Sequence, residues 1–76
     1  MTKKAGRWPL PRFEAYPDRS GEWRWRWLAR NGRIRADSGE GYWSKRSCLR
    51  SIERVRGELG ATVDVAVVVL ADPPDV

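Results

Sequence analysis

Histidine is absent from this 76-residue chain, and cysteine occurs once, at Cys48. A single cysteine cannot form an internal disulfide, and zinc would have to be bound by carboxylates and one thiolate, an unusual ligand set. Without histidine, acid–base catalysis would depend on a carboxylate pair or a lysine with a shifted pKa, and no such group of residues is expected to meet in a pocket. We therefore expect no metal, no cofactor and no enzymatic activity, and a reducing, cytoplasmic setting.

Long hydrophobic runs are missing as well. The longest apolar run, residues 65–71, has seven residues, far fewer than the roughly 18–20 that a membrane-spanning helix requires. The N-terminus has no apolar signal-peptide core, so we expect a soluble chain with no membrane partner. A chain this short forms one domain with a marginal core, and oligomerisation would add stability.

Basic residues are absent after Arg56. Residues 1–56 contain all 15 lysines and arginines with six acids, a balance of +9, whereas residues 57–76 contain four acids and no base. The net charge of +5 therefore understates a strongly basic body. Such a body attracts polyanions, either nucleic acid or an acidic protein. The alternative is that the charge serves solubility alone.

Tryptophan and arginine alternate strictly over residues 23–27. A β-strand places alternate side chains on opposite faces, whereas a helix would spread them around its axis. The pattern therefore predicts a strand with an apolar and a basic face. Asn31-Gly32 predicts a two-residue type I′ hairpin turn in which Arg30 is opposite Arg33.

Both expected hairpins place apolar residues on the tryptophan side. Counting from the Asn31-Gly32 turn sets Ala29 opposite Ile34, Trp27 opposite Ala36 and Arg26 opposite Asp37. A strand over residues 13–16, with Phe13 opposite Trp27, sets Ala15 beside Trp25, Glu14 beside Arg26 and Tyr16 beside Arg24. The agreement of the two registers predicts a three-stranded antiparallel meander.

A helix and a last strand complete the predicted domain. Ser44 is the expected N-cap of a helix that runs to about Leu59 and ends at Gly60. One side of this helix carries an apolar stripe, Cys48, Ile52, Val55 and Leu59 with Leu49 alongside; the other side carries Arg46, Arg50, Glu53, Arg54 and Gly57. The sequence also predicts a long strand over residues 62–70. The fold class is therefore α+β, in the order β-β-β-α-β, with residues 1–12 as a basic flexible arm, 13–71 as one domain and 72–76 as an acidic tail.

The last strand is apolar on both faces in its second half, and one helix can cover only one face of a four-stranded sheet. We therefore expect a homodimer in which a second copy covers this strand by edge pairing or strand exchange. The alternative is that Trp8 and the N-terminal arm fold over it. The predicted interface residues are Val65, Val67, Val68, Val69 and Leu70.

Several of these motifs together resemble the YegP-like family of small bacterial and archaeal domains of unknown function. The resemblance rests on Phe13-Glu14-Ala15-Tyr16, the run from Gly21 to Arg26, Asn31-Gly32, the run Ala36 to Tyr42, Ser44-Lys45, Cys48 and Ile52-Glu53. It implies a β-β-β-α unit with a following strand, in tandem repeats or dimers, and no catalytic site. Trp27, Arg35 and Trp43 depart from the residues commoner in the family.

The sheet face opposite the helix is the first candidate site. It would form a cationic platform able to pair with phosphates and, through its tyrosine, to stack on bases. The alternative is that this face is only solvated and carries cross-strand contacts among Glu14, Arg26 and Asp37. The residues of this predicted basic face are Tyr16, Arg24, Arg26, Arg30, Arg33 and Arg35, with Leu28 among them.

A glycine loop before the helix is the second candidate. Backbone N–H groups of such a loop can hold an anion at a helix N-terminus, although the spacing is not that of a P-loop and Glu40 would repel phosphate. Its residues are Gly39, Gly41, Ser44, Lys45 and Arg46. Tyr42 and Trp43 are candidate exposed aromatics, whereas the strand tryptophans are expected in the core and Cys48 as inert packing.

Together these features predict a non-enzymatic, homodimeric binding or assembly module whose basic sheet face contacts nucleic acid or an acidic protein. The alternatives are a structural or regulatory dimer that binds no nucleic acid and a small-ligand-binding protein, which would need a deep pocket.

Overall fold

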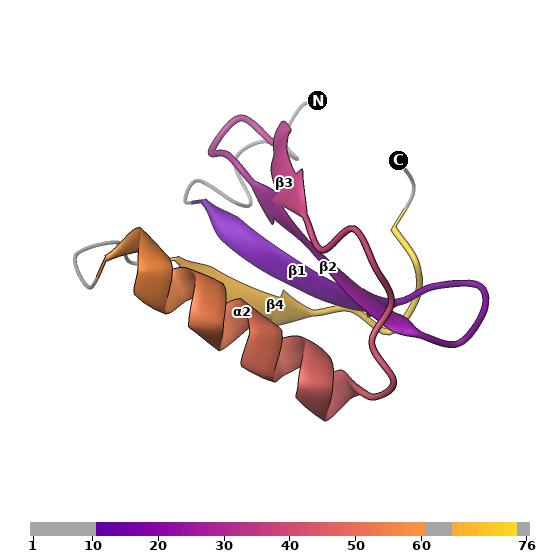
Figure 1. Cartoon of the computed structure of the whole chain (residues 1–76). Coiled ribbons are helices and arrows are strands. Elements are labelled where there is room, and N and C mark those ends of the chain that lie inside the picture. The colour runs from indigo at the N-terminus through magenta and orange to yellow at the C-terminus, as the bar shows by residue number, and fades with distance from the viewer. Residues whose placement is uncertain (1–10, 61–64, 75–76) are drawn as a thin grey trace, which may run out of the picture.

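The computed structural model describes residues 11–60 and 65–74, which form one four-stranded sheet with a helix across one face (Figure 1). Its elements are β1 (Arg12–Pro17), β2 (Trp23–Leu28), β3 (Ile34–Asp37), α2 (Lys45–Leu59) and β4 (Ala66–Val69). The strand order is β3-β2-β1-β4. β1 and β3 are antiparallel to β2, whereas β4 is parallel to β1, so the sheet is mixed.

The predicted elements are present, with shifted boundaries. β1 begins at Arg12, one residue earlier than expected, and the last strand is shorter than the predicted 62–70. Residues 62–64 of that prediction, most of the basic arm and the end of the acidic tail lie outside the described residues. No helix among the residues that the structure describes has the length and apolar character needed to cross a membrane.

The alternation of tryptophan and arginine sets the faces of the sheet as predicted. Phe13 lies opposite Trp27, and Ala15 lies opposite Trp25. Trp25 is 6% exposed in the core, and Trp23 and Trp27 pack against that core. The register of β1 with β2 is therefore the one expected from the sequence.

The turn between β2 and β3 differs from the prediction. The Gly32 N–H donates to the Ala29 carbonyl at 2.9 Å, and the Ala29 N–H donates to the Arg33 carbonyl at 2.8 Å. Among the described residues only glycines have positive φ, and Gly32 has φ 88°. Asn31 thus lacks the positive φ of a type I′ turn, and the loop has three residues with glycine last, the next most common hairpin. Ala29, not Arg30, is opposite Arg33.

The longer turn shifts the pairing of β2 with β3 by one residue, and a β-bulge then restores the expected pairing. Leu28 is opposite Ile34, but Trp27 is opposite Ala36 as predicted, so Arg35 is the extra residue. Ile34 therefore shares a face with Leu28, away from α2, and is 48% exposed instead of joining the tryptophans. Counting back from an assumed two-residue turn could not detect the bulge.

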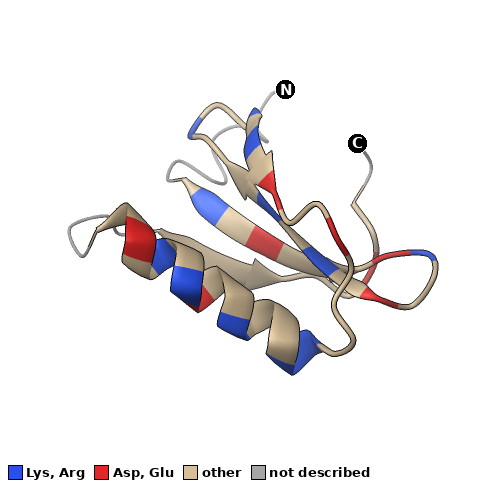
Figure 2. Ribbon diagram, in the orientation of Figure 1, with Lys and Arg blue, Asp and Glu red and all other residues tan. Residues whose placement is uncertain are grey.

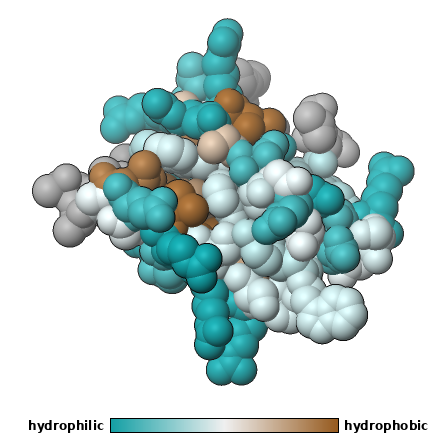
Figure 3. All heavy atoms as spheres, in the orientation of Figure 1, coloured by the Kyte–Doolittle hydropathy of each residue, from teal (hydrophilic) through white to brown (hydrophobic). Residues whose placement is uncertain are grey.

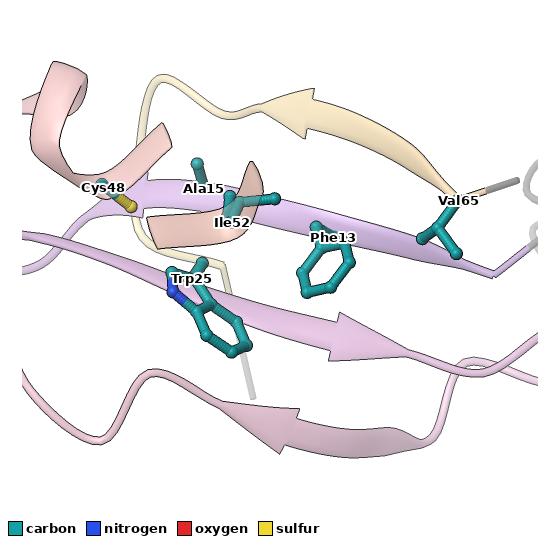
Figure 4. Packing of buried hydrophobic residues seen from close by; sticks show 6 residues of the cluster. All are labelled: Phe13, Ala15, Trp25, Cys48, Ile52 and Val65. Atoms are coloured by element: carbon teal, nitrogen blue, oxygen red, sulfur yellow. The ribbon is translucent and has the colours of Figure 1, made fainter. Parts of the chain in front are cut away.

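The core lies between α2 and the central strands (Figure 4). It consists of Phe13, Ala15, Trp25, Cys48, Ile52 and Val65. The Phe13 ring meets Trp25 edge-on, with centroids 5.3 Å apart, and stacks on Trp27 at 5.7 Å. Aromatic pairs of this kind contribute about 0.5–1.5 kcal/mol each beyond the burial of their surface.

The helix ends are as predicted. The Ser44 side chain accepts a hydrogen bond from the Ser47 N–H at 3.2 Å, and Gly60, with φ 105°, ends the helix. The apolar stripe of the helix packs against the sheet, with Leu49, Val55 and Leu59 around the buried residues. α2 contacts β1 and β2, so the two outer strands extend beyond its cover.

A small polar cluster lies inside this apolar layer. The Trp25 indole N–H donates to the Ser51 hydroxyl at 3.0 Å, and the Tyr42 hydroxyl lies 2.8 Å from the same oxygen. Tyr42 also forms a backbone bridge with Trp23. Tyr42, a candidate exposed aromatic, is thus half-buried and closes the edge of the core.

Candidate functional site

The sheet face away from α2 brings Tyr16, Arg24 and Arg26 onto adjacent positions of β1 and β2, as predicted. Arg26 is nevertheless ion-paired within the sheet. Its Nε lies 2.8 Å from one oxygen of Glu14, and the Arg12 Nε lies 3.0 Å from the other. Glu14 is 6% exposed, because the two guanidinium groups replace the water that a carboxylate otherwise requires. This triad is a structural part of the sheet.

Arg24 is likewise used internally. Its Nε donates to Asp18 at 2.8 Å, and Asp18 also accepts from the Ser20 hydroxyl at 2.6 Å and from the backbone N–H groups of Ser20 and Glu22. The Ser20 hydroxyl and then Arg24 hold the pKa of Asp18 well below its usual value. Asp18 in turn raises the pKa of Arg24. The Asp18–Arg24 ion pair thus links the turn between β1 and β2 to β2.

Arg35 does not lie with the other residues of the predicted basic face. Its guanidinium carbon is 5.2 Å from the centroid of the Trp27 ring, which is packed against the core. The three-residue turn explains the difference, because it shifts the alternation of β3 by one residue at Ile34 and Arg35 before the bulge restores the expected register at Ala36. A guanidinium over an indole is a stabilising cation–π contact. Arg35 is nevertheless exposed, as are Arg30 and Arg33 at the hairpin tip, and none of the three has an ion pair to any described residue.

The glycine loop before α2 has a carboxylate packed against it. A Cβ on Gly41 would approach the Glu22 Cβ to 2.8 Å, so the Glu22 side chain lies directly against the loop. The Ser44 hydroxyl caps the helix instead of facing a ligand. A carboxylate that already lies against the loop opposes a second anion. The anion site at Gly39, Gly41, Ser44, Lys45 and Arg46 stays a prediction.

A second set of cations lies on the outer side of α2. Arg46, Arg50 and Arg54 are spaced four residues apart and are all exposed; we call them the helix arginine row. Residues at this spacing are neighbours on one side of a helix. Figure 2 shows blue segments recurring along α2, and Figure 3 shows hydrophilic side chains projecting along the lower edge, where Figure 1 places this helix.

The row has no carboxylate partner within the described part of the chain. Glu53, the acid nearest its middle, is bound instead by Arg56, with 2.8 Å between Oε2 and Nη1. The sequence shows this row as arginines on the side opposite Cys48 and Ile52. The sequence does not show that the row lacks a carboxylate partner, because this depends on which arginines the carboxylates bind in the folded domain.

The residues of the predicted dimer interface divide into two groups. Val65 is 2% exposed inside the core of one chain, and Val67 packs against that core, so neither requires a second copy for cover. Val68 and Leu70 are half-buried, and Val69 is 47% exposed at the sheet edge. Of the predicted interface residues, Val68, Val69 and Leu70 are therefore the ones left accessible to a second copy.

Cys48 is fully buried, and this burial raises the pKa of its thiol to about 11. A thiol with that pKa is a poor nucleophile at neutral pH. Over residues 11–60 and 65–74, no three His, Cys, Asp or Glu side chains gather where they could hold a metal ion.

These features define a small α+β domain in which an antiparallel meander, one helix and a parallel edge strand enclose a single core. Residues 18–64 match the family described as "Domain of unknown function (DUF1508)". The chain belongs to this DUF1508/UPF0339 family, the YegP-like family of bacteria and archaea that its motifs resemble.

Several relatives support the assignment. A UPF0339 protein of Neisseria meningitidis serogroup B is 44% identical over 50 residues, which cover 66% of this chain and 88% of the relative. One from Agrobacterium fabrum is 45% identical over 56 residues, covering 71% and 89%. A protein from Haloferax volcanii with an NMR solution structure is 42% identical, with a TM-score of 0.61, and the match covers 74% of this chain and 92% of that one.

Proposed function

We propose that this domain is a non-enzymatic binding module that uses exposed arginines to contact an acidic partner. The observation that carries the proposal is that some arginines are ion-paired with carboxylates and others are not. Arg24 and Arg26 of the sheet are ion-paired with Asp18 and Glu14, whereas the helix arginine row has no described partner. The proposed contact surface is the outer side of α2, because there three such arginines lie in line, and not the centre of the sheet.

The helix arginine row carries an energetic cost in the isolated domain. Like charges four residues apart destabilise a helix by about 0.2–0.5 kcal/mol per pair. Arg46 and Lys45 also lie in the first turn, which contains no acid, and a cation there opposes the helix dipole by a few tenths of a kcal/mol. A bound polyanion would reverse the sign of both contributions. The arrangement is thus unfavourable alone and favourable in a complex.

A charge-matched pair of variants tests the proposal. The first variant replaces Arg46, Arg50 and Arg54 with glutamine, and the control replaces the exposed Arg19, Arg30 and Arg33. Both lose three charges. We expect the first to lose most of its affinity for a labelled heparin fragment at low salt, and the control to retain it. Equal losses would mean that net charge acts alone, and no binding by the wild type would refute the proposal.

We further propose that the domain acts as a homodimer. The proposal is supported by the sheet edges, because α2 covers the central strands, while Ile34 of β3 and Val69 of β4 are 48% and 47% exposed. Open strand edges readily pair with another chain. Light scattering after size-exclusion chromatography should give twice the chain mass, and Val69→Lys should give a folded monomer. A monomeric wild type would contradict the proposal.

The alternative is a structural or regulatory dimer that binds no nucleic acid. The same open edges favour it, and it differs in one measurable respect: the dimer would form, and the polyanion assay would show no salt-dependent binding.

A further inference from the structure

We infer that the acidic partner of α2 is single-stranded nucleic acid, held by the helix arginine row and by Trp43. The inference rests on the proposed function and adds the class of ligand. It combines two independent features of the same region: three exposed arginines in line, and one exposed indole just before the helix begins.

Trp43 is the exception among the described tryptophans. Trp23, Trp25 and Trp27 contact the core, whereas Trp43 is 89% exposed. An indole in water forgoes the burial that normally stabilises this side chain. Trp43 immediately precedes the N-cap Ser44, so it lies at the end of α2 from which Arg46 begins the arginine row.

The spacing of the row suits a strand of phosphates. At 1.5 Å per residue, arginines four residues apart are separated by about 6 Å along the helix axis, which is comparable with the separation of successive phosphates along an extended strand. A guanidinium group presents a planar pair of donors that matches two phosphate oxygens. Three arginines on a rigid helix can therefore contact three phosphates in sequence.

The indole favours an unpaired strand over the other polyanions. Every base has a stacking face, but in a duplex the neighbouring base pairs occupy it, whereas a single strand can turn a base onto an aromatic side chain. An acidic polypeptide would pair with the arginines and leave Trp43 without a corresponding group. The charges alone suit any polyanion, and Trp43 is what distinguishes among them.

Fluorescence anisotropy of a labelled 12-nucleotide oligothymidine tests the inference, with a duplex of the same length and polyglutamate as competitors. Three phosphate contacts predict that log K falls with log salt at a slope of about −2, from about −0.7 per phosphate on single strands. The glutamine variant of the arginine row should lose this slope, and the charge-matched Arg19, Arg30 and Arg33 control should keep it.

Trp43→Ala provides the second arm. Loss of one stacked base should weaken binding about five- to 150-fold and leave the salt slope unchanged, because no phosphate contact is lost. All of the substituted side chains are exposed, so the variants should retain the wild-type unfolding midpoint to within a few degrees.

The outcomes separate the inference from the function on which it rests. If Trp43→Ala binds as the wild type does, or if polyglutamate or duplex competes as well as the single strand, the assignment of a single-stranded ligand is wrong while binding to an acidic partner stands. If neither the oligonucleotide nor polyglutamate binds above background at low salt, both are wrong.

Discussion

The Ser51 hydroxyl joins two aromatic side chains inside the domain, so the loss of this one oxygen atom should be costly. Ser51→Ala removes the acceptor of the Trp25 indole N–H and the partner of the Tyr42 hydroxyl. A buried donor left without an acceptor costs about 1–3 kcal/mol. The higher helix propensity of alanine adds about 0.5 kcal/mol to the free energy of unfolding. We therefore expect a net loss of about 1.5 kcal/mol, which lowers the Tm of a domain this small by about 6–12 °C.

Urea denaturation followed by circular dichroism measures this change, and a double-mutant cycle with Tyr42→Phe assigns it. Because both aromatic side chains meet the same hydroxyl, we expect a coupling energy of at least about 0.5 kcal/mol between Ser51→Ala and Tyr42→Phe. If Ser51→Ala unfolds at the wild-type urea concentration, or if the two substitutions are additive, the hydrogen-bonded cluster does not stabilise the fold and the reasoning fails.

Three further predictions concern other parts of the domain. Glu14→Gln removes the carboxylate between two nearly buried guanidinium groups and should destabilise the fold by about 3 kcal/mol; an unchanged urea midpoint would show that the triad is dispensable. Gly57→Ala adds a methyl group on the exposed side of α2 with no atom within 4 Å and should raise stability by about 0.5–1 kcal/mol, seen as a higher Tm. Because the pKa of Asp18 is lower in the folded state than its usual 3.8, its ionised form stabilises the fold above about pH 4, and this contribution disappears as the pH falls below that value. The Tm of the wild type should therefore fall more between about pH 5 and pH 2 than that of Asp18→Asn, and parallel curves would contradict the assignment.

The strands and the helix could be predicted from local patterns because each pattern has its own period. Alternation at Trp23, Trp25 and Trp27 requires a strand that is apolar on one face, and the stripe from Cys48 to Leu59 requires a helix against that face. Ser44 and Gly60 mark the helix ends through backbone hydrogen bonding and positive φ, which are local effects. These predictions are confirmed.

The predictions that failed depended on a count or on a distant partner. One extra residue in the turn after Ala29 moved Ile34 to the other face and brought Arg35 over Trp27. The contact between Arg26 and Glu14, twelve positions away, is the alternative that the strand register allows for this face, and it is present. The sequence does not show that Arg12 shares the same carboxylate or that Arg24 binds Asp18 in the preceding turn. Charge totals could not show which arginines keep a free charge, and that distinction moved the candidate surface from the sheet to the helix.

The parallel pairing of β4 with β1 has a consequence for the nascent chain. β1, β2 and β3 are consecutive and can assemble as soon as they leave the ribosome, but β1 keeps one row of unsatisfied backbone groups until residues beyond α2 have been synthesised. In that interval the vacant edge of β1 is open to a strand from any other chain, and slower translation through the helix lengthens the exposure.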